Sequence, residues 1–491
     1  MTRPTTTGKA QDLITFTRST TGTALAKISY GEELVTNGDF SSDVSGWTLA
    51  YVTASHTPDG IKLQGNGYAY QSVPTVAGKR YVLTGNVTAF NNGNSVADYE
   101  FRVGTSTYPP NLYDGPSQTG VRALYAEFTA TTTTSFIVLK THGTTGGTQT
   151  VTWDNISVKE VSFDQPDGTL QLFNHPINKP RIEYDASGNC LGLLVEEARS
   201  NKVTYSEDFT HSSWLKQEVT VAPAPVVAPD GTMTATHVVK TGSNAHLVAT
   251  NIGSTADRSS IWARTVSGTG TMYLGGTDAS TLVTVTEEWQ KLDAQAVNPH
   301  MYAANLRGIA TLTEVYVWGA QLETGSFPTS YIPTSGSTVT RAADVASLAV
   351  SEFGYNQDQF SVVVESDFFG TDSAISTLCY IGESNDDRVL LYYNSQDVNY
   401  QVKSAGSSQA QRVVAGYVSK SAYRYKLNDM VLAGDGNIST TDTAANLLGG
   451  TQNNIYIGGY FNGSATLNGH IKSIKYYPVG LSNAQLQALT V

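Results

Sequence analysis

Short segments of alternating apolar and polar residues recur along almost the whole chain. Tyr68–Val73, Arg80–Val87 and Ala123–Phe128 are examples. Alternation with a period of two is typical of a β-strand that buries one face. Gly, Asn or Pro separates such segments at intervals of roughly 8–12 residues, which is the spacing expected of β-sandwiches. The pattern therefore predicts an all-β protein.

The one helix that the pattern predicts lies at the C-terminal end. Ser482 is a favourable N-cap, and Gln485, three residues later, completes a capping box. Leu481 and Leu486 fit the accompanying hydrophobic staple, and Leu489 continues the same apolar face. We expect one short terminal helix after a long series of strands.

Two stretches of the chain repeat one plan. LVTNGDFSSDVSGW, which ends at Trp47, parallels KVTYSEDFTHSSW, which ends at Trp214. VTWDNISV, around Trp153, parallels EVYVWGAQLETG, around Trp318. Such self-similarity predicts two related jelly rolls, at 31–162 and 201–329. Because the first and last strands of a sandwich can be neighbours, we expect Trp47 to pack on Trp153 and Trp214 on Trp318.

The opening and closing motifs of both stretches resemble jelly-roll carbohydrate-binding modules found beside glycoside hydrolases. The resemblance implies a glycan-binding module that needs no cofactor but can hold a structural calcium ion. Asp39 and Asp154, with Asn37, match the place of that ion, and carboxylate and amide oxygens are suitable ligands. Gly319 stands in the second stretch where Asp154 stands in the first, so a second site of this kind is in doubt.

Sugar contact in such a module would come from exposed aromatic rings. Tyr68 and Tyr70 share a strand face, and Tyr108 and Tyr113 flank a Pro-rich loop. We take them as candidate carbohydrate-binding residues together with Tyr51 and, near the C-terminus, Tyr460. Core packing is the alternative for each of these rings, since aromatic residues often serve as core.

Four segments of the chain resemble segments that recur in virion proteins of tailed bacteriophages, chiefly tail fibres and related tail or head appendages. They are LITFTR (ending at Arg18), PRIEYD (from Pro180), GLLVEEARSN (ending at Asn201) and YIPTSGSTVTRAADVAS (from Tyr331). The resemblance implies a virion surface component, other virion proteins as partners, and a homotrimer. The first two segments are usually close in sequence. We infer that 31–162 is inserted, and that 1–30 and 163–200 form a small discontinuous β joint.

The remaining chain divides into a connector and a last module. The connector, 330–348, contains Pro333 and Gly336. The module, 349–491, ends in HIKSIKYYP followed by the predicted helix, and this ending resembles concanavalin-like and laminin-G-like sandwiches. That resemblance implies a third sandwich, and a loop at Asp386 and Asp387 where calcium can bind.

Charge and hydropathy exclude several classes of function. The net charge of −12 disfavours nucleic-acid binding, because phosphate backbones attract basic surfaces. No apolar run reaches the roughly 18 residues that span a bilayer, and the N-terminus shows no signal-peptide pattern. Cys190 and Cys379 form no disulfide framework. These features fit assembly in the host cytoplasm, release by lysis and a place on the virion surface, without membrane insertion.

No catalytic constellation is evident. The chain has no GxSxG, HExxH, P-loop or GxGxxG motif, and its histidines lack metal-ligand spacing. Our interpretation is a non-enzymatic phage appendage that displays glycan-binding modules to a host surface polysaccharide. Two alternatives stay open: a purely structural decoration protein of capsid or tail, and a polysaccharide depolymerase with accessory sandwiches.

Overall fold

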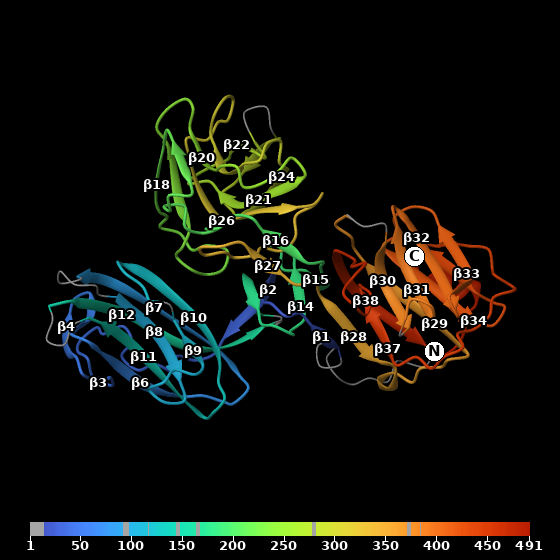
Figure 1. Ribbon diagram of the computed structural model, residues 1–491, viewed down its shortest axis with the longest axis horizontal. Coiled ribbons are helices and arrows are strands. Elements are labelled where there is room, and N and C mark those ends of the chain that lie inside the picture. The colour runs from blue at the N-terminus through green and yellow to red at the C-terminus, as the bar shows by residue number, and fades with distance from the viewer. Residues whose placement is uncertain are drawn as a thin grey trace. The chain divides into compact units, whose positions relative to one another are not determined.

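The computed structural model describes residues 14–91, 98–115, 117–143, 148–163, 167–276, 281–370, 375–382 and 384–491 (Figure 1). Its regular structure is almost entirely β-strand, so the predicted all-β class is confirmed. The chain divides into two compact units, Lys27–Thr169 and a unit made of Met1–Ala26 with Leu170–Val491. We call the first unit the N-terminal sandwich.

The N-terminal sandwich consists of two antiparallel sheets around one core. The first sheet has the order β3 (Thr48–Ala50), β6 (Gly67–Pro74), β11 (Thr134–His142), β8 (Asp98–Gly104), β9 (Tyr113–Asp114). The second has the order β10 (Arg122–Thr129), β7 (Arg80–Asn91), β12 (Thr150–Phe163), β2 (Gly22–Tyr30, in this unit from Lys27 on), with β5 (Gly60–Gln64) on β12 and β4 (Thr53–Thr57) on β5. β13 (Thr169–His175) follows β2 in the strand order and belongs to the larger unit from Leu170 on.

The inward residues of both sheets form the predicted apolar core of this sandwich. Trp153 is fully buried between Tyr99 and Phe101, with ring centroids 5.3 Å away in both cases. Trp47 belongs to the same core, where it packs on Phe40. The opening and closing tryptophans of the first repeat are thus core residues, as expected, and each has its own aromatic neighbours.

The second repeat forms a middle sandwich within the larger unit. Its strands are β17 (Leu215–Gln217), β20 (His246–Ala249) and β25 (Met301–Asn305) in one sheet; β18 (Val219–Pro223), β19 (Thr236–Lys240), β26 (Glu314–Thr324), β21 (Asp257–Arg264) and β24 (Gln290–Gln295) in another; and the pair β22 (Gly270–Leu274) and β23 (Thr281–Val285). Trp214 and Trp318 are both buried, but in different clusters. Trp214 packs on Phe209, and Trp318 packs on Tyr331 from the predicted connector, so the expected pairing of the two tryptophans is wrong.

The C-terminal sandwich has two seven-stranded sheets. One has the order β1 (Thr15–Thr17), β28 (Val345–Ala349), β37 (Asn454–Ile457), β30 (Ser376–Gly382), β31 (Arg388–Asn394), β32 (Asp397–Ser404), β33 (Ser407–Val414). The other has the order β14 (Arg181–Tyr184), β15 (Cys190–Val195), β38 (Gly469–Tyr477), β29 (Gln359–Ser366), β34 (Lys420–Lys426), β35 (Val431–Gly434), β36 (Asn437–Ile438). A 3-10 turn, η1 (Val350–Glu352), follows β28.

The predicted terminal helix is α2 (Asn483–Leu489). Its capping box is present: the Ser482 hydroxyl accepts from the Gln485 amide nitrogen, and the Gln485 side chain accepts from the Ser482 backbone. Leu481 and Leu486 lie in one small apolar cluster with strands β29 and β35, which fixes the helix on the sheet.

The two segments expected to make a separate joint are in part paired with each other, because β2 and β13 are neighbours in one sheet. Their other strands, β1, β14 and β15, lie at the edges of the C-terminal sandwich (Figure 1). β1 pairs with β28, and β15 pairs with β38. Phe16, Leu193 and Val195 enter the main apolar core of that sandwich. Three short strands offer too little apolar surface for a core of their own, whereas the edges of two larger sheets supply one. The connector is likewise built in: β27 (Val339–Arg341) pairs with β16 (Arg199–Asn201), and β28 belongs to the sandwich.

A buried cluster of charges joins these edge segments. Arg18, Arg181, Arg341, Glu196 and Asp344 each have 1% or less of their surface exposed, and we call them the charge cluster. Arg18 Nη1 lies 3.0 Å from Asp344 Oδ1, and Arg181 Nη1 lies 2.8 Å from Glu196 Oε2. Burial opposes ionisation of Glu196, but the charges of Arg341 and Arg181 outweigh it and lower the pKa of Glu196.

In the described part of the chain, no helix is long and apolar enough to cross a membrane. Cys190 is exposed, Cys379 is buried, and both are free. Burial raises the pKa of the Cys379 thiol to about 12, so this cysteine is an inert core residue.

Candidate functional site

The best candidate site is the outer face of the five-stranded sheet in the N-terminal sandwich. Along β6, Ala69 and Val73 enter the core, so Tyr68 and Tyr70 point to the other side. Strands β8 and β11 alternate in the same way. We call this surface the polar face; its residues are Tyr68, Tyr70, Asp98, Glu100, Arg102, Phe136, Lys140 and His142.

Three aromatic rings cross the polar face from β6 to β11. The ring of Tyr70 lies between those of Tyr68 and Phe136, with centroid distances of 6.0 and 6.1 Å. All three side chains are partly exposed. The ammonium group of Lys140 lies 5.9 Å from the Tyr68 ring. Half-exposed rings in a row present an apolar surface that water covers poorly, and hydrogen-bonding groups flank it.

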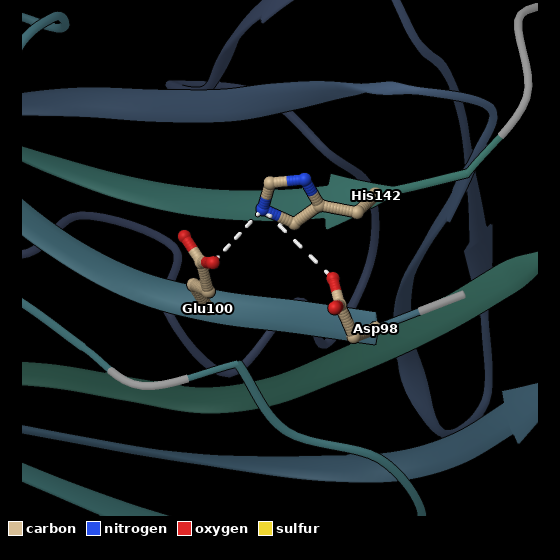
Figure 2. Close-up of side chains that lie close together, drawn as sticks. All are labelled: Asp98, Glu100 and His142. Carbon is tan, nitrogen blue, oxygen red and sulfur yellow. Dashed lines mark ion pairs between the residues drawn. The ribbon is translucent and has the colours of Figure 1, made fainter. Parts of the chain in front are cut away.

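Beside the rings, Figure 2 shows the imidazole of His142 on β11 directed at two carboxylates of β8. His142 Nε2 lies 3.1 Å from Glu100 Oε1 and 3.9 Å from Asp98 Oδ1. Strand pairing places these groups together, because His142 stands opposite Asp98 and Lys140 stands opposite Glu100. About a third of the His142 side chain is exposed, while its Nε2 and the facing Asp98 Oδ1 are buried.

Glu100 is the most buried acid of the polar face, and its partners keep it ionised. The Ser117 hydroxyl donates to Oε1 at 2.8 Å, and Arg102 Nη2 lies 2.5 Å from Oε2. Burial opposes ionisation, but the hydrogen bonds from Ser117 and His142 and the charges of His142 and Arg102 outweigh it, so the pKa of Glu100 is lowered. Glu100 is therefore a hydrogen-bond acceptor at neutral pH.

Asp98, Glu100 and His142 are also residue types that bind metal ions. Asp98, Glu100 and His142 can bring one ligand atom each to within 4.8 Å of the others. Arg102, however, already pairs with Glu100 and with Asp114, 3.1 Å from its Nε. A dication here would have to displace that guanidinium. The arrangement is better suited to polar hydroxyl groups than to a metal ion.

The other tyrosines expected to bind sugar in this sandwich are not on the polar face. Tyr51 follows β3 and is 87% exposed, and Tyr108 lies in the loop after β8 and is 72% exposed. Tyr113, on β9, packs against the core, and this burial raises the pKa of its hydroxyl. Of the six candidate tyrosines, only Tyr68 and Tyr70 are brought together.

The charges of Asp39 and Asp59 act on Asp154, the other predicted calcium residue, although among the described residues these three acids do not form a group whose oxygens all lie within 4.8 Å of one another. Asp154 Oδ1 is buried without a hydrogen-bond partner among the described residues. Burial, followed by the negative charges of Asp39 and Asp59, raises the pKa of Asp154. An unpartnered carboxylate oxygen beside two further acids fits a hard cation. The amide nitrogen of Asn37 is directed elsewhere, since it donates to Asp43 and Ser45.

The site residues predicted in the C-terminal sandwich have structural surroundings. Asp387 accepts hydrogen bonds from the Ser404 hydroxyl and the Ala405 amide, and the carbonyl of Asp386 accepts from Gly406. These bonds brace one loop against the β32–β33 turn. Tyr460 is only 8% exposed and packs on Tyr380, so the expectation of an exposed sugar-stacking ring is wrong there.

Sequence reasoning missed six residues of the polar face: Asp98, Glu100, Arg102, Phe136, Lys140 and His142. The signal for β8 was present, because DYEFRVG alternates and places Asp98, Glu100 and Arg102 on one side. Their meeting with Phe136 and His142 depends on the pairing of β8 with β11, between residues more than thirty positions apart. Alternation gives the face of each residue but not its cross-strand partner.

No family model matches the chain, and no match was found among curated proteins. The solved structures that are similar to it include the following two. A tandem of two CBM22 domains from Paenibacillus barcinonensis Xyn10C covers 60% of this chain and 98% of its own length, at 13% identity and a TM-score of 0.22. Domains LG4-5 of the mouse laminin alpha1 chain cover 49% and 90%, at 12% identity and a TM-score of 0.19. Likenesses at these TM-scores give no basis for transferring a ligand.

Proposed function

We propose that the N-terminal sandwich binds a carbohydrate on its polar face, without turnover. The observation that carries this proposal is the row of partly exposed rings of Tyr68, Tyr70 and Phe136 beside paired charges. Ring faces stack on the CH groups of a pyranose, while carboxylate and guanidinium groups bond its hydroxyls. Because Glu100 and Arg102 are held by partners, they are oriented before a ligand arrives.

The test measures binding of the full-length chain to a panel of bacterial surface polysaccharides by affinity electrophoresis. Tyr70→Ala removes the central ring, and Arg102→Gln removes the guanidinium. We expect each variant to bind the retarding polysaccharide at least about tenfold more weakly, which corresponds to about 1.4 kcal/mol. Leu282→Ala, an exposed apolar residue of the middle sandwich, is the matched control and should bind as wild type does.

Two results would contradict the proposal. One is a wild-type chain that is retarded by none of the polysaccharides, and the other is a Tyr70→Ala variant that binds as tightly as wild type. Release of reducing ends from a bound polysaccharide would favour a depolymerase instead. Binding that survives in both face variants but disappears with the whole sandwich would place the site elsewhere in that unit.

The wider role that we propose is a bacteriophage virion appendage that adsorbs to host polysaccharide, most simply as a homotrimer. Its support is the resemblance of the four segments, together with the meeting of their charged residues in the charge cluster. Several weak sites on one particle gain avidity, because each later contact is intramolecular. Sedimentation equilibrium and antibody labelling of particles test the trimer and its position. If antibodies against the chain label the particles but the purified chain does not bind host cells, a decoration protein is favoured.

A further inference from the structure

One buried arginine of the C-terminal sandwich differs from the other buried arginines of the described residues, because no carboxylate pairs with it. Six arginines are buried, and five of them have a carboxylate within 4.0 Å. These are Arg18 and Arg181 with Asp344, Arg199 with Glu197, Arg341 with Glu196, and Arg424 with Asp429. Arg388, on β31 of the C-terminal sandwich, is only 8% exposed and has no ion pair with any described residue.

Neutral groups hold the Arg388 guanidinium in place. Its Nη2 donates to Gln401 Oε1 at 2.9 Å, and its Nη1 donates to Asn385 Oδ1 at 3.2 Å. Its Cζ lies 5.6 Å from the centre of the Tyr460 ring. Its Nε is buried and has no hydrogen-bond partner in the described structure. The cation is thus oriented by two amides and one ring, and no carboxylate among the described residues neutralises its charge.

The surroundings add positive charge and further amides. Lys403 on β32 stands opposite Arg388, and Gln401 stands opposite Gln411 on β33. Gln411 is exposed, and Gln401 and Lys403 are partly exposed. The nearest acids along the chain, Asp386 and Asp387, lie in the preceding loop, and Asp387 is occupied by Ser404 and Ala405. The edge of this sheet face therefore carries two cations, Arg388 and Lys403, and several hydrogen-bonding amides, next to a loop with two acids.

A buried charge without a counter-ion is costly, since an ion loses its hydration when it leaves water. The fold meets that cost elsewhere by pairing each buried arginine with a carboxylate. An arginine that pairs with no carboxylate in the described part of the chain, beside an accessible lysine, points to a counter-ion from outside. A guanidinium fork matches the geometry of a carboxylate, and amide side chains bond the hydroxyls of a sugar.

We propose that Arg388 and Lys403 form a binding site for the anionic group of an acidic saccharide, a carboxylate or a sulfate. The oxyanion of the ligand pairs with the Arg388 guanidinium. Gln401 and Gln411 contact the hydroxyl groups of the sugar. This site lies in a different unit from the polar face. It does not depend on the carbohydrate proposed there.

The experiment titrates the full-length chain with methyl glucuronide, a sulfated methyl glucoside and uncharged methyl glucoside, and follows binding by saturation-transfer NMR. We expect the two anionic probes to bind and the uncharged probe to bind far more weakly. Their relative affinities tell a carboxylate ligand from a sulfate ligand. Arg388→Gln should weaken anionic binding at least about tenfold, and Arg388→Lys should weaken it partly, because lysine lacks the fork. Tyr70→Ala should change none of these affinities.

Thermal unfolding of the same variants guards against a folding artefact. If Arg388 carries an unpaired buried charge, Arg388→Gln should unfold at the same temperature as wild type or higher. The proposal is overturned if neither anionic probe binds, if the uncharged glucoside binds as well as they do, or if Arg388→Gln keeps anionic binding. A markedly lower unfolding temperature of Arg388→Gln would also overturn it, because Arg388 would then be a structural brace.

Discussion

Arg181 and Asp344 form an ion pair in which neither side chain has any exposed surface. Asp344 Oδ1 pairs with Arg18. Asp344 Oδ2, which pairs with Arg181, also accepts a hydrogen bond from the Glu196 amide at 2.9 Å. One carboxylate thus ties together three segments that are more than 140 positions apart in the sequence. Those segments carry the strands β1, β14, β15 and β28 at the edges of the C-terminal sandwich.

The first prediction concerns that carboxylate. Asp344→Asn leaves Arg18 buried without its counter-charge and Arg181 with Glu196 as its carboxylate partner, so it should lower the free energy of unfolding by about 3–5 kcal/mol. Urea unfolding followed by tyrosine and tryptophan fluorescence measures the change. Asp358→Asn, at an exposed position of the same sandwich, is the control and should change stability little. Equal stability of both variants would mean that the charge cluster does not hold the edge strands.

The charge cluster also shows what sequence could and could not reveal. The four segments that resemble phage virion proteins each contribute a charged residue to the cluster. They contain the motifs FTR, PRIEYD, VEEARSN and TRAADVAS. Their alternation predicted strands but not partners. Pairing between residues so far apart depends on sheet edges that no local pattern marks. That is why a separate joint was expected where two large sheets accept the strands instead.

A second prediction tests whether the N-terminal sandwich is a domain inserted into the rest of the chain. Tyr30 on β2 stands opposite Val161 on β12, so a two-residue Asn-Gly turn can replace Gly31–Glu160. We expect the shortened chain to fold, with near-wild-type unfolding of the remaining sandwiches in calorimetry. Ile182→Asp in the full chain should be far more damaging, by about 2–5 kcal/mol, because Ile182 packs against the core of the C-terminal sandwich. A shortened chain that is insoluble or unfolded would reject the insertion.

The third prediction is a calcium effect in the N-terminal sandwich. Asp154 has a buried, unpartnered oxygen, and Asp39 and Asp59 repel it, so a bound Ca²⁺ should relieve that repulsion. We expect added CaCl₂ to raise the unfolding temperature of this sandwich, and chelation to reverse the rise. Asp154→Asn should abolish the response, whereas Asp386→Asn should leave it intact. A wild-type chain whose unfolding is the same with calcium and with chelator would rule the site out.

The polar face was predictable only in part, for a related reason. Tyr68 and Tyr70 lie two positions apart on one strand, so alternation alone placed them together. The charged half of the face comes from β8 and β11, where His142 meets Asp98 only through strand pairing. Tyr460 shows the opposite failure: it was expected to be an exposed sugar-binding ring, yet it packs on Tyr380. The composition of a loop does not show whether the loop packs over a sheet or extends into solvent.

The last prediction concerns a buried acid of the middle sandwich. Glu207 accepts a hydrogen bond from the Tyr331 hydroxyl at 2.8 Å, close to Asp230. Burial, and then the charge of Asp230, raises the pKa of Glu207 from 4.5 to about 7. The folded chain therefore binds this proton more tightly than the unfolded chain does. Its contribution is complete below about pH 4.5 and is lost as the pH rises through about 7.

Glu207→Gln keeps the shape and removes the titration. At about pH 8 the variant should be more stable than wild type, by roughly 1–3 kcal/mol, and the difference should shrink as the pH falls towards 5. Thermal unfolding of both chains across this range measures it, with the exposed Glu288→Gln as the control. If Glu207→Gln is less stable than wild type at about pH 8, the ionised carboxylate must have a favourable partner, such as a bound cation. Calcium added to the wild-type chain at that pH would then separate the two explanations, because only a cation site would gain stability from it.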